Sequence, residues 1–498
     1  MSRDTTSFSQ FIRYQNSELV VDEVPCTELI ERFGTPLYVI SEQQISYNVA
    51  RFRSAFRERY PDTDVLFATK ANNNLAVRRI YSLAGAGADC FGIGELLVSL
   101  HAGTPPRLMV LNGWLKTETE LRLAIRYGIA VHLDSVDEYD QVARIAHDLG
   151  RPVRLGIRTR LMMRGLDAVM SDWPQAGSPP EGDPVGVNMR ERDKYGISEA
   201  DIPDLCKRAE QDPLITLAGL HNHVGRERGD TSVITAAITE QLQLAARLRD
   251  ELGWRPEYLD FGGGMAFGRS EGHGPLGRDR DVPSYEEYAE DMVATLREGL
   301  TAYDLGKPRL LVEPGRSLAS NTGILLSRVL GRKHVPETGQ TWLGVDASQN
   351  HMPNNLSGGF YYHPVPVREF AGPVQRHVNI ADPQCWYGNL NFDVQFPALE
   401  VGEALAFLDT GAYCESKALN FNLSPKPATI LVSGREADIV ARRESLDDIL
   451  QRIEMPERLG GNLPSDAGMP AWKFLSWANP AADQVFPKSA EVFGPEEI

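Results

Sequence analysis

Between residues 65 and 315, short apolar runs rich in β-forming residues alternate with longer stretches in which apolar residues recur at helical spacing. This alternation predicts parallel strands joined by helices. The clearest helical stretches follow Glu120, Val136 and Ile234. Eight strand–helix units in succession favour a (β/α)8 barrel of the TIM type, while periodicity alone leaves a doubly wound open sheet as the alternative. The strand-like runs begin at Val65, Ala86, Arg107, Ala130, Arg154, Leu217, Tyr258 and Arg309.

Two segments interrupt this pattern. Residues 162–193 and 268–283 carry proline, glycine and charge without clear periodicity. Both follow strands, so in a barrel both lie on the catalytic face, where long loops often act as lids. Disordered surface insertions explain the two segments equally well.

After residue 320 the pattern changes to short β-type runs separated by turns. This predicts a second, mostly antiparallel β domain that extends to about residue 460. Residues 461–498 are rich in proline, glycine and alanine and form a C-terminal extension in this interpretation. The β-type runs begin at Ile324, Thr341, Val378, Ala404 and Ala428.

Composition excludes several classes of protein. A net charge of −17 argues against a nucleic acid or an anionic membrane as partner. No uninterrupted apolar run in the sequence is long enough to span a bilayer, and the first residues lack the apolar core of a secretory signal. The five cysteines are scattered and show no CxxC spacing, which predicts a cytoplasmic protein without a disulfide framework or a metal site.

Polar residues collect where the predicted strands end. Lys70 ends the first strand, His221 and His223 end the sixth, a glycine triplet follows the seventh, and Glu313 ends the eighth. In a barrel all of these lie at the C-terminal mouth, where the loops after strands seven and eight typically bind phosphate. Each residue alone has an ordinary structural explanation, such as a turn, a hydrogen-bonded histidine or a surface ion pair.

Taken together, these residues predict a site for pyridoxal 5′-phosphate. Lys70 can form a Schiff base with an aldehyde, and His223 can stack on a ring. Glu313 can keep a pyridine nitrogen protonated, which makes the ring an electron sink. Arg316 can add a charged fork to a phosphate. Glycines allow backbone N–H groups to approach the phosphate closely, and the triplet is Gly262, Gly263 and Gly264.

At this point the chain resembles a known family. The segments FATKANNN, GADCFGIGEL, LNGWLKTETEL, LHNHVG, DFGGG, VEPGRSLASNTG and DTGAYCESKALNFN follow in order over most of residues 30–435. They are similar to the fold-type III pyridoxal-phosphate decarboxylases, which include the diaminopimelate and ornithine decarboxylases. The resemblance implies a barrel over 36–320 and a β domain built from 1–35 and 321–460. It also implies a homodimer whose active sites lie at the interface.

The resemblance also implies roles for individual residues. Lys70 matches the Schiff-base lysine, His223 the ring-stacking histidine and Glu313 the partner of the pyridinium. Cys385 matches an interface cysteine that comes from the second subunit and protonates the carbanion left after CO2 departs. As an alternative, Cys385 is a small buried apolar residue. The residues that match phosphate contacts are Gly262, Gly263, Gly264, Arg316 and Tyr413.

The chain departs from the family at the positions that read the substrate. An acidic residue usually follows the cysteine and pairs with a distal ammonium, but here Trp386 and Tyr387 follow Cys385. Asn350 lies near the place where the diaminopimelate branch has an Arg-Pro element. Arg226 stands where the family has a serine, and it can contact phosphate or substrate. Packing at the dimer interface is the alternative role for Trp386.

These departures favour a decarboxylase with an altered amino-acid substrate, whose side chain is not a simple distal ammonium. The alternatives are a meso-diaminopimelate decarboxylase of lysine biosynthesis, an amino-acid racemase, and a non-catalytic regulatory homologue. A proton donor such as Cys385 weighs against the racemase.

Overall fold

The computed structural model describes residues 8–160, 162, 194–224, 230–267, 282–357, 360–370, 375–385, 389–397, 399–453, 456 and 458. The described residues from Ile45 to Ser320 form one compact unit, the barrel unit. Those before Ile45 and after Ser320 form the other, the β unit.

In the described part of the barrel unit, eight parallel strands close into a barrel. Consecutive strands are neighbours throughout, and the last pairs with the first. The closed barrel confirms the predicted architecture and excludes the open sheet. Each strand also overlaps a run expected from the sequence. The strands are β5 (Thr63–Ala68), β6 (Gly87–Cys90), β7 (Met109–Leu111), β8 (Ala130–Leu133), β9 (Val153–Arg158), β10 (Ile215–His223), β11 (Tyr258–Gly262) and β12 (Arg309–Glu313).

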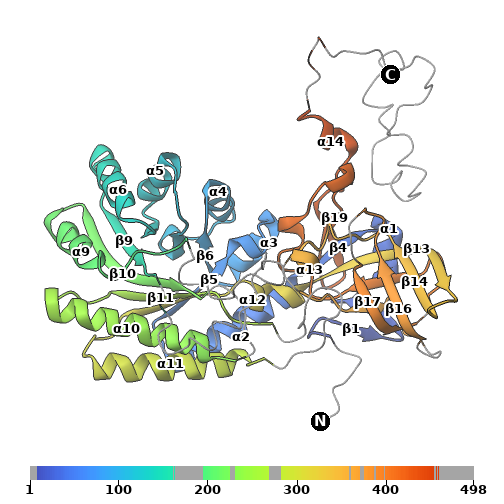
Figure 1. Ribbon diagram of the computed structural model, residues 1–498, viewed down its shortest axis with the longest axis horizontal. Helices are drawn as coiled ribbons and strands as arrows, with labels where there is room; N and C mark the ends of the chain where they lie inside the picture. Colours follow the sequence, from blue (N-terminus) through green and yellow to red (C-terminus); the bar gives the residue numbers. More distant parts are fainter. Residues whose placement is uncertain are drawn as a thin grey trace. The chain divides into compact units, whose positions relative to one another are not determined.

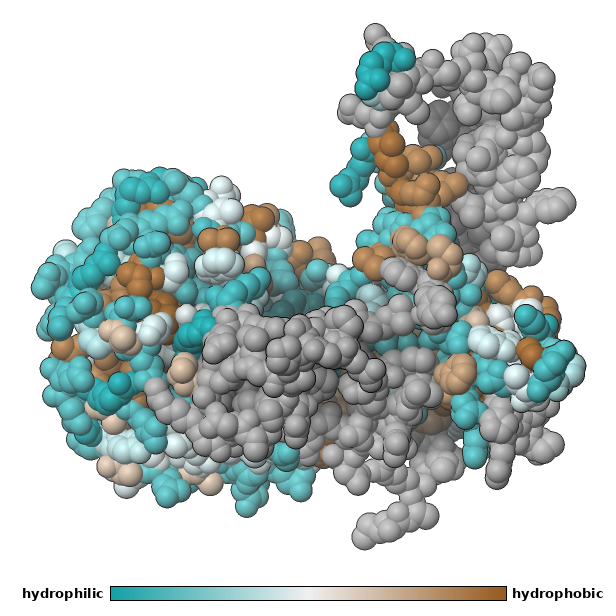
Figure 2. Space-filling model, viewed as in Figure 1, coloured by the Kyte–Doolittle hydropathy of each residue, from teal (hydrophilic) through white to brown (hydrophobic). Residues whose placement is uncertain are grey.

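Helices lie around the outside of these strands (Figure 1). The helix after β7 shows how the sequence sets its limits: Thr117 and Glu120 form a capping box at its start, and Gly128 ends it with a φ of 71°. The helices are α2 (Glu42–Arg59), α3 (Leu75–Leu83), α4 (Ile93–His101), α5 (Glu118–Tyr127), α6 (Val136–Leu149), α9 (Ile202–Gln211), α10 (Ser232–Leu252), α11 (Tyr285–Ala302) and the short α12 (Arg316–Ala319). The described face of this unit in Figure 2 is mostly hydrophilic, with scattered apolar residues.

Apolar side chains from five of the strands pack together as one core cluster of Leu66, Val110, Ala218, Tyr258 and Leu311. A small parallel barrel is filled by inward-facing side chains in this way, so it is a packed core and not a pore. Polar side chains therefore project from the strand ends above a closed apolar floor.

The described residues of the β unit form a nine-stranded sheet and a small sheet of β1, β2 and β3. Most pairs in the large sheet are antiparallel, as predicted, and β14–β16 and β19–β4 are parallel. The strands are β1 (Ile12–Gln15), β2 (Glu18–Val21), β3 (Val24–Pro25), β4 (Leu37–Ser41), β13 (Gly323–Val335), β14 (Gln340–Val345), β15 (Pro364–Pro366), β16 (Gln375–Ala381), β17 (Asn391–Phe396), β18 (Ala404–Phe407), β19 (Ala428–Ser433) and β20 (Glu436–Ala441). The helices are α1 (Cys26–Phe33), α13 (Asn354–Ser357) and α14 (Leu446–Leu450).

Strand β4 lies inside the large sheet, between β13 and β19. All five of its residues are buried. The domain limits expected at 35/36 and 320/321 remain a prediction. Among the described residues, the compact units differ from these limits at one point, because β4 pairs with strands of the β unit and the barrel unit begins only at Ile45.

Residues 163–193, residues 268–281 and the whole C-terminal extension, residues 461–498, lie outside the described residues, so the proposed roles of these segments remain predictions. Among the helices that the structure describes, none is long and apolar enough to cross a membrane.

Candidate active site

Polar side chains at the C-terminal ends of the barrel strands converge on one place. The structure brings together three side chains expected from the sequence: Lys70, His223 and Glu313. It adds Asp89 from the end of β6 and Asn112 from directly after β7, and neither of these was predicted. The available signal was a polar residue at the end of a buried strand for Asp89, and one directly after a buried strand for Asn112.

Lys70 lies in the short 3-10 turn Thr69–Ala71 that follows β5. Its Nζ donates to Asp89 Oδ2 at 2.7 Å and lies 5.6 Å from the centre of the Phe91 ring. The Lys70 side chain is 31% exposed, whereas that of Asp89 is 1% exposed. The amine is therefore held by a buried carboxylate and can still be reached from the mouth of the barrel.

Glu313 ends β12 and is buried. Its Oε2 lies 3.3 Å from His221 Nε2 and 3.6 Å from His223 Nδ1. Burial opposes ionisation of Glu313, but its close contacts with the imidazoles of His221 and His223 outweigh burial and hold the pKa of this carboxyl well below its usual range. Glu313 is thus a buried anion that can pair with a protonated ring nitrogen.

His223 ends β10, and 18% of its side chain is exposed. Burial lowers the pKa of this imidazole to about 4, against the opposing effect of Glu313. The ring is therefore neutral near pH 7, which suits stacking on another flat ring.

The glycines after β11 leave room for that histidine. Gly263 and Gly264 have φ angles of 68° and 81°, in the left-handed region that favours glycine. A Cβ on Gly263 would lie 2.5 Å from His223 Nε2. The turn is thus a narrow backbone cradle beside His223 and Glu313, and it suits an anion.

Gly263→Ala is expected to weaken cofactor binding about 10-fold or more, because the new methyl group must displace His223. The measurement is the dissociation constant for pyridoxal 5′-phosphate. Gly253→Ala is the matched control, since Gly253 has a φ of 69° but open space around it. It should cost about 1 kcal/mol of stability and leave binding unchanged. If Gly263→Ala and Gly253→Ala bind the cofactor equally well, the glycine turn does not form part of the cofactor site.

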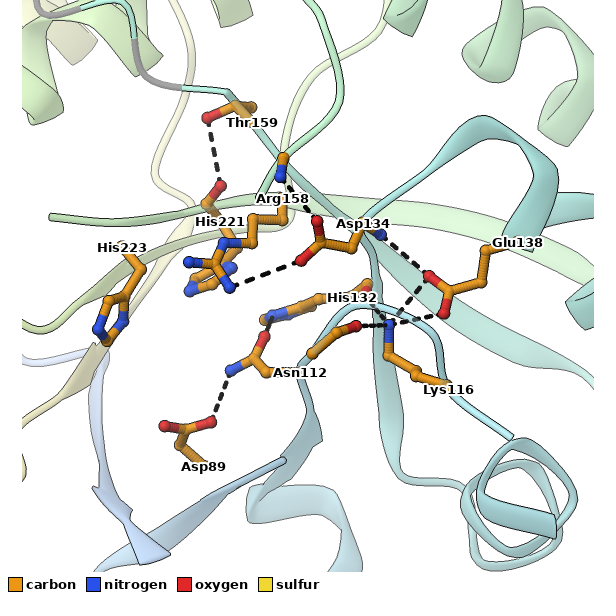
Figure 3. Close-up of polar contacts among 12 residues, drawn as sticks. Asp89, Asn112, Lys116, His132, Asp134, Glu138, Arg158, Thr159, His221 and His223 are labelled. Carbon is orange, nitrogen blue, oxygen red and sulfur yellow. Dashed lines mark hydrogen bonds and ion pairs between the residues drawn. The ribbon is translucent and has the colours of Figure 1, made fainter. Parts of the chain in front are cut away.

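A second buried cluster supports the strand ends beside this site (Figure 3). Lys116 Nζ donates to both carboxylate oxygens of Glu138 at 2.9 Å, to the Gly113 carbonyl at 2.6 Å and to the His132 carbonyl at 2.7 Å. The Lys116 and Glu138 side chains are 2% and 5% exposed. Lys116 thus ties the loop after β7 to β8 through the His132 carbonyl, and to the first turn of α6 through Glu138.

Next to the Lys116–Glu138 ion pair, Arg158 Nη1 lies 3.5 Å from Asp134 Oδ2, and Arg158 Cζ lies 4.1 Å from the centre of the Tyr195 ring.

Potential metal-ligand atoms of His132, His221 and Glu313 lie within 4.8 Å of one another, a spacing that could hold a metal ion. Both ring nitrogens of His132 already have protein partners, because Nδ1 bonds to Asn112 and Nε2 to Tyr258. The expectation of no metal site stays a prediction.

The remaining predicted residues belong to other elements of the chain. Arg316 starts α12, three residues after Glu313, and belongs to the barrel unit. Tyr413, Cys385 and Asn350 belong to the β unit. Trp386, Tyr387 and Arg226 lie outside the described residues.

Within the β unit, Cys385 is exposed and its Sγ lies 3.4 Å from the side chain of Asn422. Asn350 is buried, and its Nδ2 donates to the Phe421 carbonyl at 2.8 Å. This contact gives Asn350 a structural role, whatever else it binds. Tyr413 is partly buried and has a φ of 58°.

Comparison with known proteins adds independent findings. Residues 44–320 match the family model described as pyridoxal-dependent decarboxylase, pyridoxal binding domain. A diaminopimelate decarboxylase of Methanothermobacter thermautotrophicus is 29% identical over 89% of this chain and 96% of its own length. That of Neisseria meningitidis serogroup A is 30% identical over 86% of this chain and 97% of its own length. The crystal structure of the M. jannaschii diaminopimelate decarboxylase with L-lysine has a TM-score of 0.79, with 27% identity, and covers 91% of this chain and 99% of that one.

Proposed function

The chain belongs to the pyridoxal-dependent decarboxylases, and from this we propose what its residues do and which amino acid it accepts. The protein is a pyridoxal 5′-phosphate-dependent carboxy-lyase that acts on an amino acid. The proposal concerns the residues that hold the cofactor, the proton donor and the substrate.

The residues of the barrel mouth fit the cofactor. Lys70 supplies a reachable amine for the cofactor aldehyde, and Glu313 supplies a buried anion for the pyridine nitrogen. His223 stacks on the ring beside the glycine turn. When bound, the cofactor supplies an electron sink for the pair left by a broken Cα–carboxylate bond. The proposed phosphate contacts are Gly262, Gly263, Gly264, Arg316 and Tyr413.

Cys385 is the proposed proton donor to Cα after CO2 leaves. Its exposure and its amide neighbour Asn422 support a thiol that is accessible to a reacting atom. By resemblance to the family, this thiol comes from the second subunit of a homodimer, so that two chains share each active site. A cytoplasmic location is part of the same proposal, on the basis of the scattered cysteines.

The substrate is proposed to be an amino acid without a simple distal ammonium. The observation that carries this is the sequence after Cys385, where Trp386 and Tyr387 replace the expected acid. Trp386 can form a cation–π contact but no salt bridge. Arg226 and Asn350 are further candidates for contact with the substrate. meso-Diaminopimelate is the second candidate, favoured by relatives that are named diaminopimelate decarboxylases.

The test is a screen of amino acids and amino-acid conjugates, with mass spectrometry for loss of CO2. We expect turnover of a bulky or aromatic substrate in preference to meso-diaminopimelate. Equal or faster turnover of meso-diaminopimelate would reject the altered substrate. Racemisation without loss of CO2 would reveal the alternative chemistry. Trp386→Glu should shift preference towards diamino acids, and Trp386→Phe serves as its control.

A further inference from the structure

One side-chain amide joins the two carboxylates on which the proposed cofactor site depends. Asn112 is 2% exposed, and its Nδ2 lies 2.7 Å from Asp89 Oδ1 and 2.7 Å from Glu313 Oε1. A side-chain amide has two N–H groups, so each can donate to one carboxylate. Asp89 uses its other oxygen to hold Lys70. A hydrogen-bonded path therefore runs from the amine of Lys70 to Glu313.

The surroundings fix the orientation of this amide. The opposite orientation would place its carbonyl oxygen against two carboxylates. With Nδ2 on the carboxylates, Oδ1 lies 2.7 Å from His132 Nδ1 (Figure 3). His132 Nδ1 must therefore carry the hydrogen, and Nε2 accepts from the Tyr258 hydroxyl at 3.0 Å. Burial lowers the pKa of His132 well below its usual range, which agrees with a neutral ring.

We propose that Asn112 is a positioning residue that holds Asp89 and Glu313 together, so that one hydrogen-bonded unit serves both the amine and the pyridine end of the cofactor. This inference rests on the proposed roles of Lys70 and Glu313. It goes beyond them, because it makes the roles of Lys70 and Glu313 depend on each other through Asn112, a residue to which the proposed function gives no part.

Other titratable groups also face these two carboxylates. Burial and the charge of Glu313 raise the pKa of Asp260 well above its usual range, so Asp260 adds no further negative charge. Burial and the charge of Asp89 raise the pKa of Glu95 to about 7. The described titratable groups that face Asp89 or Glu313 are Lys70, Cys90, Glu95, His132, His221, His223, Tyr258 and Asp260.

The test measures the dissociation constant for pyridoxal 5′-phosphate as a function of pH, for Asn112→Ser and Asn112→Leu. The amide donors stabilise the ionised form of Glu313, so their loss raises its pKa. Binding that needs this anion is then lost at a higher pH as the solution is acidified. We call the pH below which cofactor binding is lost the acid limit. We expect the acid limit to rise by about one pH unit in Asn112→Ser, with affinity about tenfold weaker below it, and to rise further in Asn112→Leu.

Asn391→Ser is the matched control. Asn391 is a buried asparagine of the β unit whose Nδ2 donates to the Tyr362 carbonyl at 3.0 Å. It should lose stability without moving the acid limit. Circular dichroism shows which variants fold. If Asn112→Leu does not fold, the cofactor binding of Asn112→Ser alone tests the proposal. A folded Asn112→Ser with the affinity and acid limit of the wild type would overturn the proposal.

Failure of the proposed function gives a different result. Glu313→Gln removes the anion itself, so it should weaken cofactor binding at every pH above the acid limit. If Glu313→Gln binds like the wild type, the role of Glu313 in the proposed function is wrong. If Glu313→Gln weakens binding and Asn112→Ser does not, the proposed function stands and the inference about Asn112 fails.

Discussion

Lys70→Ala is expected to lower the rate of decarboxylation by about 10⁴-fold or more, which is the loss typical when an enzyme's covalent catalytic group is removed. The Lys70 amine is held by Asp89 at 2.7 Å, with 31% of the side chain exposed. The variant loses the group that bonds to the cofactor aldehyde. It keeps Glu313 and the glycine turn, so weak binding of the cofactor should persist.

Two measurements check this expectation. Release of CO2 gives the rate, and borohydride reduction followed by mass spectrometry locates the covalently bound cofactor. The wild type should carry the reduced cofactor on Lys70, and Lys70→Ala should carry none. Lys307→Ala is the control, because Lys307 is exposed and precedes β12 at the opposite end of the barrel. A rate for Lys70→Ala within tenfold of the wild type would exclude the assignment of Lys70.

Lys116→Met is expected to lower the free energy of unfolding by about 3–5 kcal/mol, the usual cost of removing one partner of a buried ion pair. It leaves Glu138 as a buried, unpaired carboxylate with a 5% exposed side chain. It also removes the donor to the carbonyls of Gly113 and His132. The loss should appear in urea unfolding followed by circular dichroism.

Two further variants separate the ion pair from general damage. The double variant Lys116→Met/Glu138→Leu should recover most of the loss, because it removes the unpaired charge as well. Lys207→Met should change stability by no more than about 0.5 kcal/mol, since the Lys207–Asp204 pair is 55% and 82% exposed. If Lys116→Met is as stable as Lys207→Met, the buried Lys116–Glu138 pair contributes little to the free energy of unfolding.

The barrel could be predicted from the sequence because each of its strands is buried on both faces. Runs such as VLFA in β5 and RLLVE in β12 are therefore nearly continuous in apolar residues, and their order along the chain is their order around the barrel. Lys70, His223 and Glu313 could be found for the same reason, because each stands where a recognisable strand ends.

Residues that act through a neighbouring strand were harder to find. The role of Asp89 depends on its contact with Lys70, 19 residues away in the chain, and that of Asn112 on its contact with Glu313, 201 residues away. A polar residue at the end of a strand or directly after it is also common where a loop begins, so position along the strand alone could not separate a structural residue from a functional one. Strand β4 was not located by pattern either, because its partners come from the far end of the sequence.

The position of β4 also affects how the protein folds while it is being synthesised. The ribosome completes β4 early, but β13 and β19, which flank it, emerge about 280 and 390 residues later. All of the barrel strands are synthesised in that interval. Because domains form largely as units during synthesis, the barrel can fold before β4, a strand that is fully buried in the folded protein, has paired with its neighbours. A nascent chain of this protein therefore exposes two unpaired strand edges for most of its synthesis, which is the kind of segment that chaperones shield.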